Sequence, residues 1–264
     1  MKYYVSVDME GIAGIVIPEQ LARDGPFYQE ARRLLTEEVN LIVESLLQEG
    51  ATEIIVKDAH GTGFNFIPDQ LHPGASYVMG ATRVGARFPG LDSSFSGAFL
   101  IGYHSMAGTA YSIRDHTYAS NEWQSIKING MEMGEIGIDS LLFGLHGVPI
   151  LLVTGDDKAC KEAKEILGEG VFTYITKRAF GRHAGILLPP RKVYHELPGI
   201  IRESVRGQKL TPMQISPPYE MTVRFLSTDQ ADRVFIDGKA TIRLDGLTVT
   251  FKENDLYHML SHII

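Results

Sequence analysis

Apolar and polar positions in the first part of the chain predict short strands and one long helix. Residues 3–7, 53–57, 76–79 and 97–101 are short segments rich in apolar, β-branched and aromatic residues, as is typical of strands in a sheet. Residues 27–48 have leucine, isoleucine and valine at spacings of three and four, which predicts an amphipathic helix. Strand, long helix, strand is the order expected of a parallel sheet with helices on its faces.

The alternation of strands and helices continues beyond the middle of the chain. Strands are predicted at residues 123–128, 131–133, 149–154 and 171–176, and helices at 135–145, 156–167 and 191–205. Asn129-Gly130 predicts a tight hairpin between the first two of these strands. We therefore expect an α/β protein with three layers, α/β/α, around a largely parallel or mixed sheet.

The last quarter of the chain has a different composition. Three prolines within residues 208–218 predict a linker. Strands are predicted after it at 219–226, 240–244 and 247–251, followed by a terminal helix from Asn254. The expected organisation is a large α/β metal-binding catalytic domain over residues 1–208 and a smaller α+β domain over 209–264.

Composition narrows the class of protein. The 264 residues include 25 Lys and Arg against 32 Asp and Glu, a net charge of −7, which disfavours binding to nucleic acid. The N-terminal segment lacks a signal-peptide core, and the least charged stretch, 139–156, contains Gly and Pro, so no membrane span is predicted. The single cysteine, Cys160, is typical of a reducing compartment, and we expect a cytoplasmic protein. With nine histidines, any metal would be held by nitrogen and oxygen ligands.

Carboxylates and histidines follow three of the predicted strands, where sites gather in open α/β sheets. Asp8 and Glu10 follow the first strand two residues apart, so in extended backbone they point to one face. Two such carboxylates repel unless a cation lies between them, and a divalent metal is the natural cation. The alternative is that Asp8 caps a turn and Glu10 is solvated. His60 and His104 follow the second and fourth strands; taken singly, each is better explained as a loop or core histidine.

Several further residues permit two interpretations. Asp58 either orients a histidine ligand or, as we prefer, forms a turn. Glu135 near a helix start and Glu132 before it are not distinguished by spacing. His116 is either a proton shuttle or a loop histidine paired with a neighbouring aspartate. Asp156 is interpreted first as a helix cap. The histidines that have no other candidate site residues near them in the sequence are assigned to the surface or to core packing: His72, His183, His195, His258 and His262.

Taken together, these motifs resemble the bacterial zinc-dependent D-aminopeptidases, a family once labelled a dipeptide transport protein. The matching segments run in the family's order across about residues 1–160: Ser6-Val7-Asp8-Met9-Glu10-Gly11-Ile12, Asp58-Ala59-His60, Gly102-Tyr103-His104, Asn129-Gly130 with Gly134-Glu135, and Gly155-Asp156-Asp157.

The resemblance implies a binuclear site with two Zn²⁺ per chain. Asp8 would bridge the ions, Glu10 and His60 would complete one, and His104 and Glu135 the other; this selects Glu135 over Glu132. His116 matches a proposed catalytic residue of the family. Homo-oligomerisation is also implied, since a known member forms a homodecamer.

The implied activity is that of a metallo-aminopeptidase, which removes the N-terminal residue of short peptides or amino-acid amides by metal-activated water. Substrates that contain D-amino acids follow from the resemblance, not from the residues. The alternatives are another two-metal hydrolase, such as a phosphoesterase or amidase, and a dipeptide-binding protein without catalysis. No GxxxxGK phosphate loop is present in the sequence, which argues against the phosphoesterase.

Overall fold

The larger of two sheets in the molecule has seven strands. The computed structural model describes residues 1–82 and 87–263. The strand order is β3-β2-β1-β4-β7-β8-β9, parallel except for the antiparallel pair β8–β9. The strands are β1 (Lys2–Val7), β2 (Glu53–Asp58), β3 (Ser76–Val78), β4 (Gly97–Tyr103), β7 (Ile150–Asp156), β8 (Phe172–Gly181) and β9 (Ala184–Leu187).

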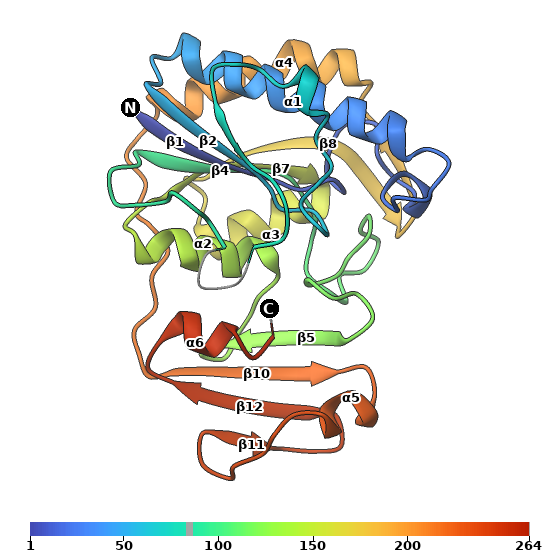
Figure 1. Cartoon of the computed structure of the whole chain (residues 1–264), viewed down its shortest axis with the longest axis vertical. Coiled ribbons are helices and arrows are strands. Elements are labelled where there is room, and N and C mark those ends of the chain that lie inside the picture. Colours follow the sequence, from blue (N-terminus) through green and yellow to red (C-terminus); the bar gives the residue numbers. More distant parts are fainter. Residues whose placement is uncertain (83–86, 264) are drawn as a thin grey trace.

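Helices cover both faces of this sheet. Helices α1 (Tyr28–Gln48) and α4 (Pro190–Arg206) lie on one face, and α2 (Glu135–Leu145) and α3 (Asp157–Leu167) lie on the other (Figure 1). On β1, Tyr3, Val5 and Val7 are buried with α1 and α4, whereas Tyr4 is buried in the cluster on the α2 face. Both faces of β1 are thus apolar, as a sheet covered on two sides requires. The expected three-layer α/β/α fold with a mixed, largely parallel sheet is confirmed.

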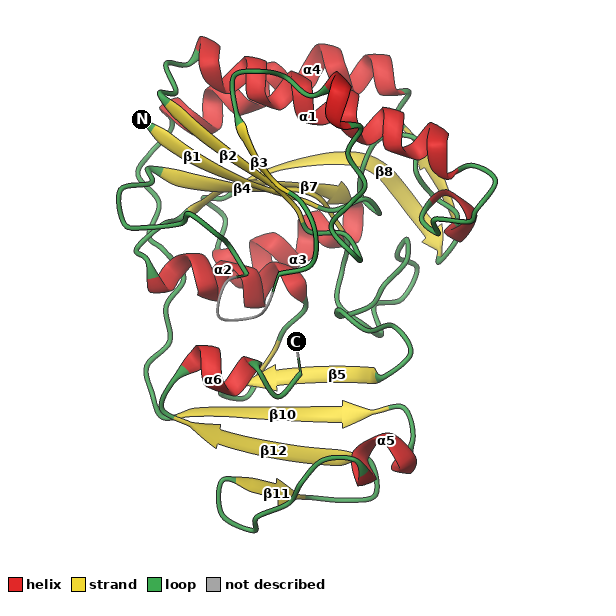
Figure 2. Ribbon diagram, viewed as in Figure 1, coloured by secondary structure: helices red, strands yellow, loops and turns green. Residues whose placement is uncertain are grey.

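A second sheet lies beyond α2 and α3 (Figure 2). Its order is β11-β12-β10-β5-β6, and all of its described pairs are antiparallel. The strands are β5 (Trp123–Ile128), β6 (Met131–Glu132), β10 (Tyr219–Phe225), β11 (Thr241–Arg243) and β12 (Thr248–Glu253). The short helices α5 (Thr228–Asp232) and α6 (Leu256–Leu260) accompany it.

The hairpin of β5 and β6 comes from the middle of the chain but pairs with the C-terminal strands. Val223 of β10 lies opposite Ile126 of β5, for example. A boundary at residue 208 therefore does not separate the two sheets, because hydrogen bonds join segments from both sides of it. The division into domains 1–208 and 209–264 stays a prediction.

Most predicted elements are present within a few residues of their expected ends. The structure adds β9, α5 and the short 3-10 helices η1 (Pro18–Gln20) and η2 (Pro68–Gln70). Among the described residues, every helix is too short or too polar to cross a bilayer.

Strand order brings the candidate residues to one edge of the larger sheet. Strands β2, β1, β4 and β7 are consecutive neighbours and parallel, so their carboxyl ends meet. Val7 at the end of β1 lies opposite Asp58 on one side and Ile101 on the other. The segments that follow these strands contain Asp8, His60 and His104, which are therefore adjacent in space.

Candidate metal centre

Two glycines allow the loop after β1 to lie against β4. A Cβ on Gly11 would lie 2.4 Å from the carbonyl oxygen of Tyr103, and one on Gly102 would lie 2.3 Å from that of Asp8. Gly102 also has a φ of +69°, which glycine adopts without strain. The backbone amide of Gly11 donates to the Gly102 carbonyl at 2.7 Å. Glycine at both positions holds Asp8 beside the strand that leads to His104.

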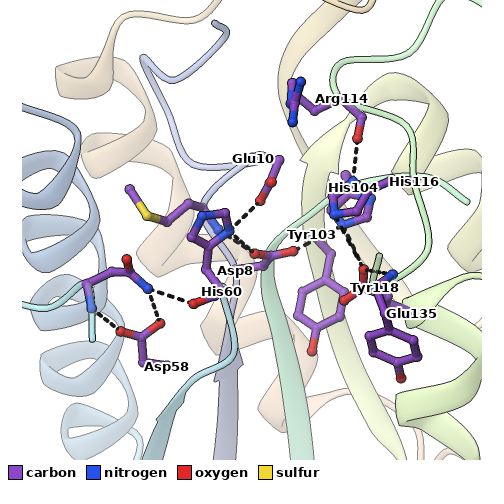
Figure 3. A network of polar contacts seen from close by, with 12 residues as sticks. Asp8, Glu10, Asp58, His60, Tyr103, His104, Arg114, His116, Tyr118 and Glu135 are labelled. Atoms are coloured by element: carbon purple, nitrogen blue, oxygen red, sulfur yellow. Dashed lines mark hydrogen bonds and ion pairs between the residues drawn. The ribbon is translucent and has the colours of Figure 1, made fainter. Parts of the chain in front are cut away.

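The first half of the site joins Asp8, Glu10 and His60. The Nδ1 atom of His60 lies 3.0 Å from Oδ1 of Asp8 and 3.0 Å from Oε2 of Glu10. Both carboxylates are buried. Figure 3 shows the two acidic side chains converging on this imidazole.

The second half joins Asp8, His104 and Glu135. The Nε2 atom of His104 lies 3.3 Å from Oδ2 of Asp8 and 3.2 Å from Oε1 of Glu135. Asp8 therefore faces His60 with one oxygen and His104 with the other (Figure 3). This is the arrangement that a carboxylate bridging two metal ions requires.

The bonding of His104 tests whether these residues suit a cation. Its Nδ1 lies 3.0 Å from the carbonyl oxygen of Ser105, so Nδ1–H donates there, and in the neutral imidazole Nε2 carries the lone pair. That Nε2 is buried and has no hydrogen-bond partner within residues 1–82 and 87–263. A lone pair directed at two carboxylates is unfavourable unless a cation lies between them. Imidazole nitrogen and carboxylate oxygen are the ligands that zinc accepts, so the residues present fit this metal.

The pKa shifts of these buried groups also indicate that the cluster requires positive charge. Burial raises the pKa of Asp8, but the neighbouring His104 and His60 outweigh burial and hold it well below its usual value. Burial lowers the pKa of His104, yet Glu135 and Asp8 overcome this and raise it well above the ordinary range. Without a metal, protons on the histidines compensate the buried carboxylates.

His116 lies directly against this cluster. Its ring stacks on that of His104 at 3.9 Å between centroids, and its Nε2 lies 3.7 Å from Oε1 of Glu135. Its Nδ1 donates to the carbonyl of Arg114 at 2.7 Å, which leaves Nε2 free to take or give a proton. Glu135 itself begins α2 and accepts from the backbone amide of Tyr118 at 2.8 Å. Glu132, on β6, is exposed and pairs with a lysine instead.

Two aspartates of the motifs support loops near the site. Asp58 accepts from the backbone amide of Asn65 at 2.5 Å and from its side-chain amide at 2.8 Å, and that side chain also donates to the carbonyl of His60. This is the turn role preferred from sequence. Asp156 caps α3, accepting from Lys158 and Ala159, as expected. Its second oxygen accepts from Ser112 and Ile113, so it also anchors the loop that leads to His116.

Lys177 is a supporting residue that sequence reasoning missed. Its buried ammonium donates to the carbonyls of Glu10, Ile12 and Ile15 at 2.7, 2.7 and 2.6 Å. Burial lowers its pKa from 10.5 to about 8. The sequence offered little signal for it, because Lys177 lies between Thr176 and Arg178 in a strand of mixed polarity. The bonds of Lys177 hold the loop that contains Asp8 and Glu10.

A second buried network, also missed, lies behind His104. Arg87 donates to both oxygens of Asp139 at 2.5 and 2.9 Å. The hydroxyls of Tyr103 and Tyr118 donate to the same carboxylate at 2.7 and 3.1 Å. Tyr103 immediately precedes His104, so this network restrains the backbone beside that ligand candidate.

A cavity of about 470 Å³ opens onto the cluster. Its lining includes Asp8, Glu10, His60, His116 and Glu135. The cations Lys57, Arg87 and Arg114 also line it, and Nε of Arg114 is buried with no hydrogen-bond partner in the described part of the chain. The cavity thus combines a metal-type donor set with positive charge, which suits a small ligand with an anionic end.

Two histidines assigned to the surface or core are brought together by the fold. His258 and His262 both lie near Glu253, with closest N–O distances of 3.2 and 3.5 Å. This group belongs to the smaller sheet, not to the centre described above. His72 contacts Glu44 through Nε2 at 3.1 Å and accepts from the Gly74 amide through Nδ1, which agrees with a surface role.

Comparison with known proteins agrees with the fold and the motifs. A family model described as D-aminopeptidase, peptidase family M55, matches residues 1–264, so the chain belongs to that family and is a peptidase hydrolase. A curated D-aminopeptidase of Bacillus subtilis (strain 168) is 30% identical over 257 residues, 97% of this chain and 93% of the relative. A solved structure described as "Zn-dependent D-aminopeptidase DppA from Bacillus subtilis, a self-compartmentalizing protease" is also 30% identical. It aligns with a TM-score of 0.93 over 100% of this chain and 95% of its own. The resemblance seen in the sequence is confirmed.

Proposed function

We propose that this D-aminopeptidase uses two zinc ions held by Asp8, Glu10, His60, His104 and Glu135. The observation that supports this most directly is the placement of Asp8, whose two oxygens face two different imidazoles at 3.0 and 3.3 Å. The partnerless Nε2 of His104 supports a cation on that side. The zinc dependence stated for the similar Bacillus subtilis enzyme agrees with this donor set.

Bound at these residues, zinc would supply a Lewis acid and a water activated near neutral pH. The chain provides the remaining functions. His116 holds its proton on Nδ1 against the Arg114 carbonyl, so its Nε2 can exchange a proton with the reacting group at the edge of the cluster. The Tyr118 amide and the first turn of α2 orient Glu135.

The proposed substrates are short peptides or amino-acid amides whose N-terminal residue has the D-configuration. The names of the relatives support the configuration. The cavity of about 470 Å³ is in the range of small-ligand sites, which supports a short substrate. Arg114, at the cavity wall, is our candidate for the free carboxylate of a dipeptide, because its guanidinium faces no carboxylate among the described contacts.

We further propose that the protein is a cytoplasmic homo-oligomer, with the decamer as the form that the resemblance implies. The description of the similar Bacillus subtilis enzyme as self-compartmentalizing supports closed assembly. Light scattering coupled to size exclusion measures the number of chains directly; a monomer at micromolar concentration would contradict this part of the proposal.

The central experiment pairs metal content with hydrolysis. Glu10→Ala and His104→Ala should each lose bound zinc and hydrolysis of D-amino-acid amides and dipeptides, whereas His72→Ala, a surface histidine, should lose neither. Matched L-amides test the configuration, and chelation followed by zinc addition tests reversibility. Full activity of metal-free protein would refute the proposal. Two zinc ions per chain support catalysis by a pair, and one ion without hydrolysis would favour a structural metal.

A further inference from the structure

A second group of metal-type donors lies at the end of the smaller sheet. Glu253 is the last residue of β12, and the chain then turns into α6. His258 in α6 and His262 just after it are four residues apart, so their side chains lie on one side of this turn. One ligand atom from each of the three residues lies within 4.8 Å of the other two.

The distances within this group are short enough for one divalent ion to reach all three side chains. Nδ1 of His258 lies 3.2 Å from Oε2 of Glu253, and Nε2 of His262 lies 3.5 Å from Oε1 of the same carboxylate. Ligand atoms around a zinc ion with bonds of about 2.1 Å are separated by about 3.4 Å at tetrahedral angles. Two imidazoles and one carboxylate are also a ligand set that zinc uses when a further position is open.

Packing orders part of this group without a metal, namely the His262 ring and the backbone of α6. The ring of His262 stacks on Phe251, with 4.6 Å between centroids and 19° between planes, and Phe251 is buried on β12. Asp255 caps α6 by accepting from the backbone amide of His258 at 2.7 Å. Leu256 and Met259 anchor the other side of α6 in the core. An ion would therefore find the His262 ring and the helix backbone already ordered, and it would mainly have to order the exposed His258 side chain.

We propose that Glu253, His258 and His262 bind one zinc-type divalent ion, separate from the metal centre at the edge of the larger sheet. Water completes the coordination, because both histidines are open to solvent. The ion connects β12 to the last residues of the chain and so restrains the C-terminal segment. The proposal stands whether the main centre holds two ions, one or none.

The test counts zinc as a difference between proteins whose main centre is intact. Equilibrium dialysis against micromolar to submillimolar free zinc, with metal analysis, should give one more equivalent in the wild type than in the His258→Ala/His262→Ala double variant. Glu253→Gln should bind that equivalent at least about 10-fold more weakly, since it removes the charged ligand. His72→Ala is the matched control, since His72 faces a single carboxylate, and it should keep the extra equivalent.

A second readout follows the chain end itself. Zinc should slow amide hydrogen exchange in residues 253–263 of the wild type and of His72→Ala, but not of the double variant. The proposal would be overturned if the double variant kept the extra zinc equivalent, or if all proteins bound the same number of zinc ions across the zinc range. His258 and His262 would then simply contact the Glu253 carboxylate without a metal. Because D-amidase activity is not a readout here, failure of this proposal leaves the proposed function untouched.

Discussion

Replacement of Lys177 by methionine tests how the chain holds the loop of Asp8 and Glu10 in the candidate metal centre. The ammonium donates to three carbonyls, those of Glu10, Ile12 and Ile15, at 2.6–2.7 Å. Methionine has similar length and no charge, so Lys177→Met removes these bonds while it keeps most of the packing. The loop should then lose its main attachment to β8.

The magnitude follows from two opposing terms. Each buried carbonyl left without a donor costs about 1–3 kcal/mol, or about 3–9 kcal/mol for three. A pKa lowered from 10.5 to about 8 corresponds to about 3 kcal/mol spent on keeping Lys177 charged, which the variant recovers. We therefore expect a net loss of about 3 kcal/mol in the free energy of unfolding. Zinc affinity should fall by about 10- to 100-fold, as for other residues that orient metal ligands.

Urea denaturation of the metal-free protein measures the first quantity, and competition with a chromophoric chelator measures the second. Leu197→Ala, on the buried face of α4 and outside the centre, is the control: it should cost about 2–5 kcal/mol with zinc affinity unchanged. If Lys177→Met binds zinc as tightly as Leu197→Ala, the lysine supports the fold alone and our reasoning about the loop is wrong.

Three further predictions concern separate residues. His116→Asn should lower kcat by about 10²–10⁴ while zinc content stays at the wild-type value; loss of zinc would instead make His116 a ligand. Arg114→Met should raise KM for dipeptides by about 10- to 100-fold and leave that for amino-acid amides nearly unchanged, in steady-state kinetics; equal effects on both would exclude recognition of the carboxylate. Burial raises the pKa of Glu38 from 4.5 to about 7, so the folded state holds a proton that the unfolded state releases, and wild-type stability falls as pH rises through this window. The stability of Glu38→Gln relative to wild type should therefore rise by about 3 kcal/mol between pH 4.5 and 7 in urea titrations, and a flat difference would contradict the shift.

The fold class was predictable because its main signals are local. Helix α1 has apolar residues at helical spacing over 21 residues, β4 is a continuous apolar run, and β1 is mostly apolar. Such patterns depend only on which face of each element is buried. The short strand β9 and the helix α5 were missed, since four or five residues provide too little periodicity.

Pairing between distant segments was not predictable in the same way. The residues of the β5–β6 hairpin do not by themselves determine which of the two sheets it joins. Its place beside β10 depends on the match between its apolar face and strands nearly 100 residues later. The sequence pattern therefore predicted a domain boundary at residue 208, although the second sheet contains strands from both sides of that residue.

By itself, the sequence determined the order of strands and helices, the carboxylates and histidines at the strand ends, and the family to which their motifs belong. Only the tertiary structure decided which of these groups meet. In the folded chain, the two oxygens of Asp8 face different imidazoles, and Lys177 donates to the loop that contains Glu10. His258 and His262 lie beside one carboxylate. The physical reason is that burial and periodicity are properties of neighbouring residues. The position of one side chain relative to another far along the chain depends instead on strand order, and strand order is set by the packing of the whole molecule.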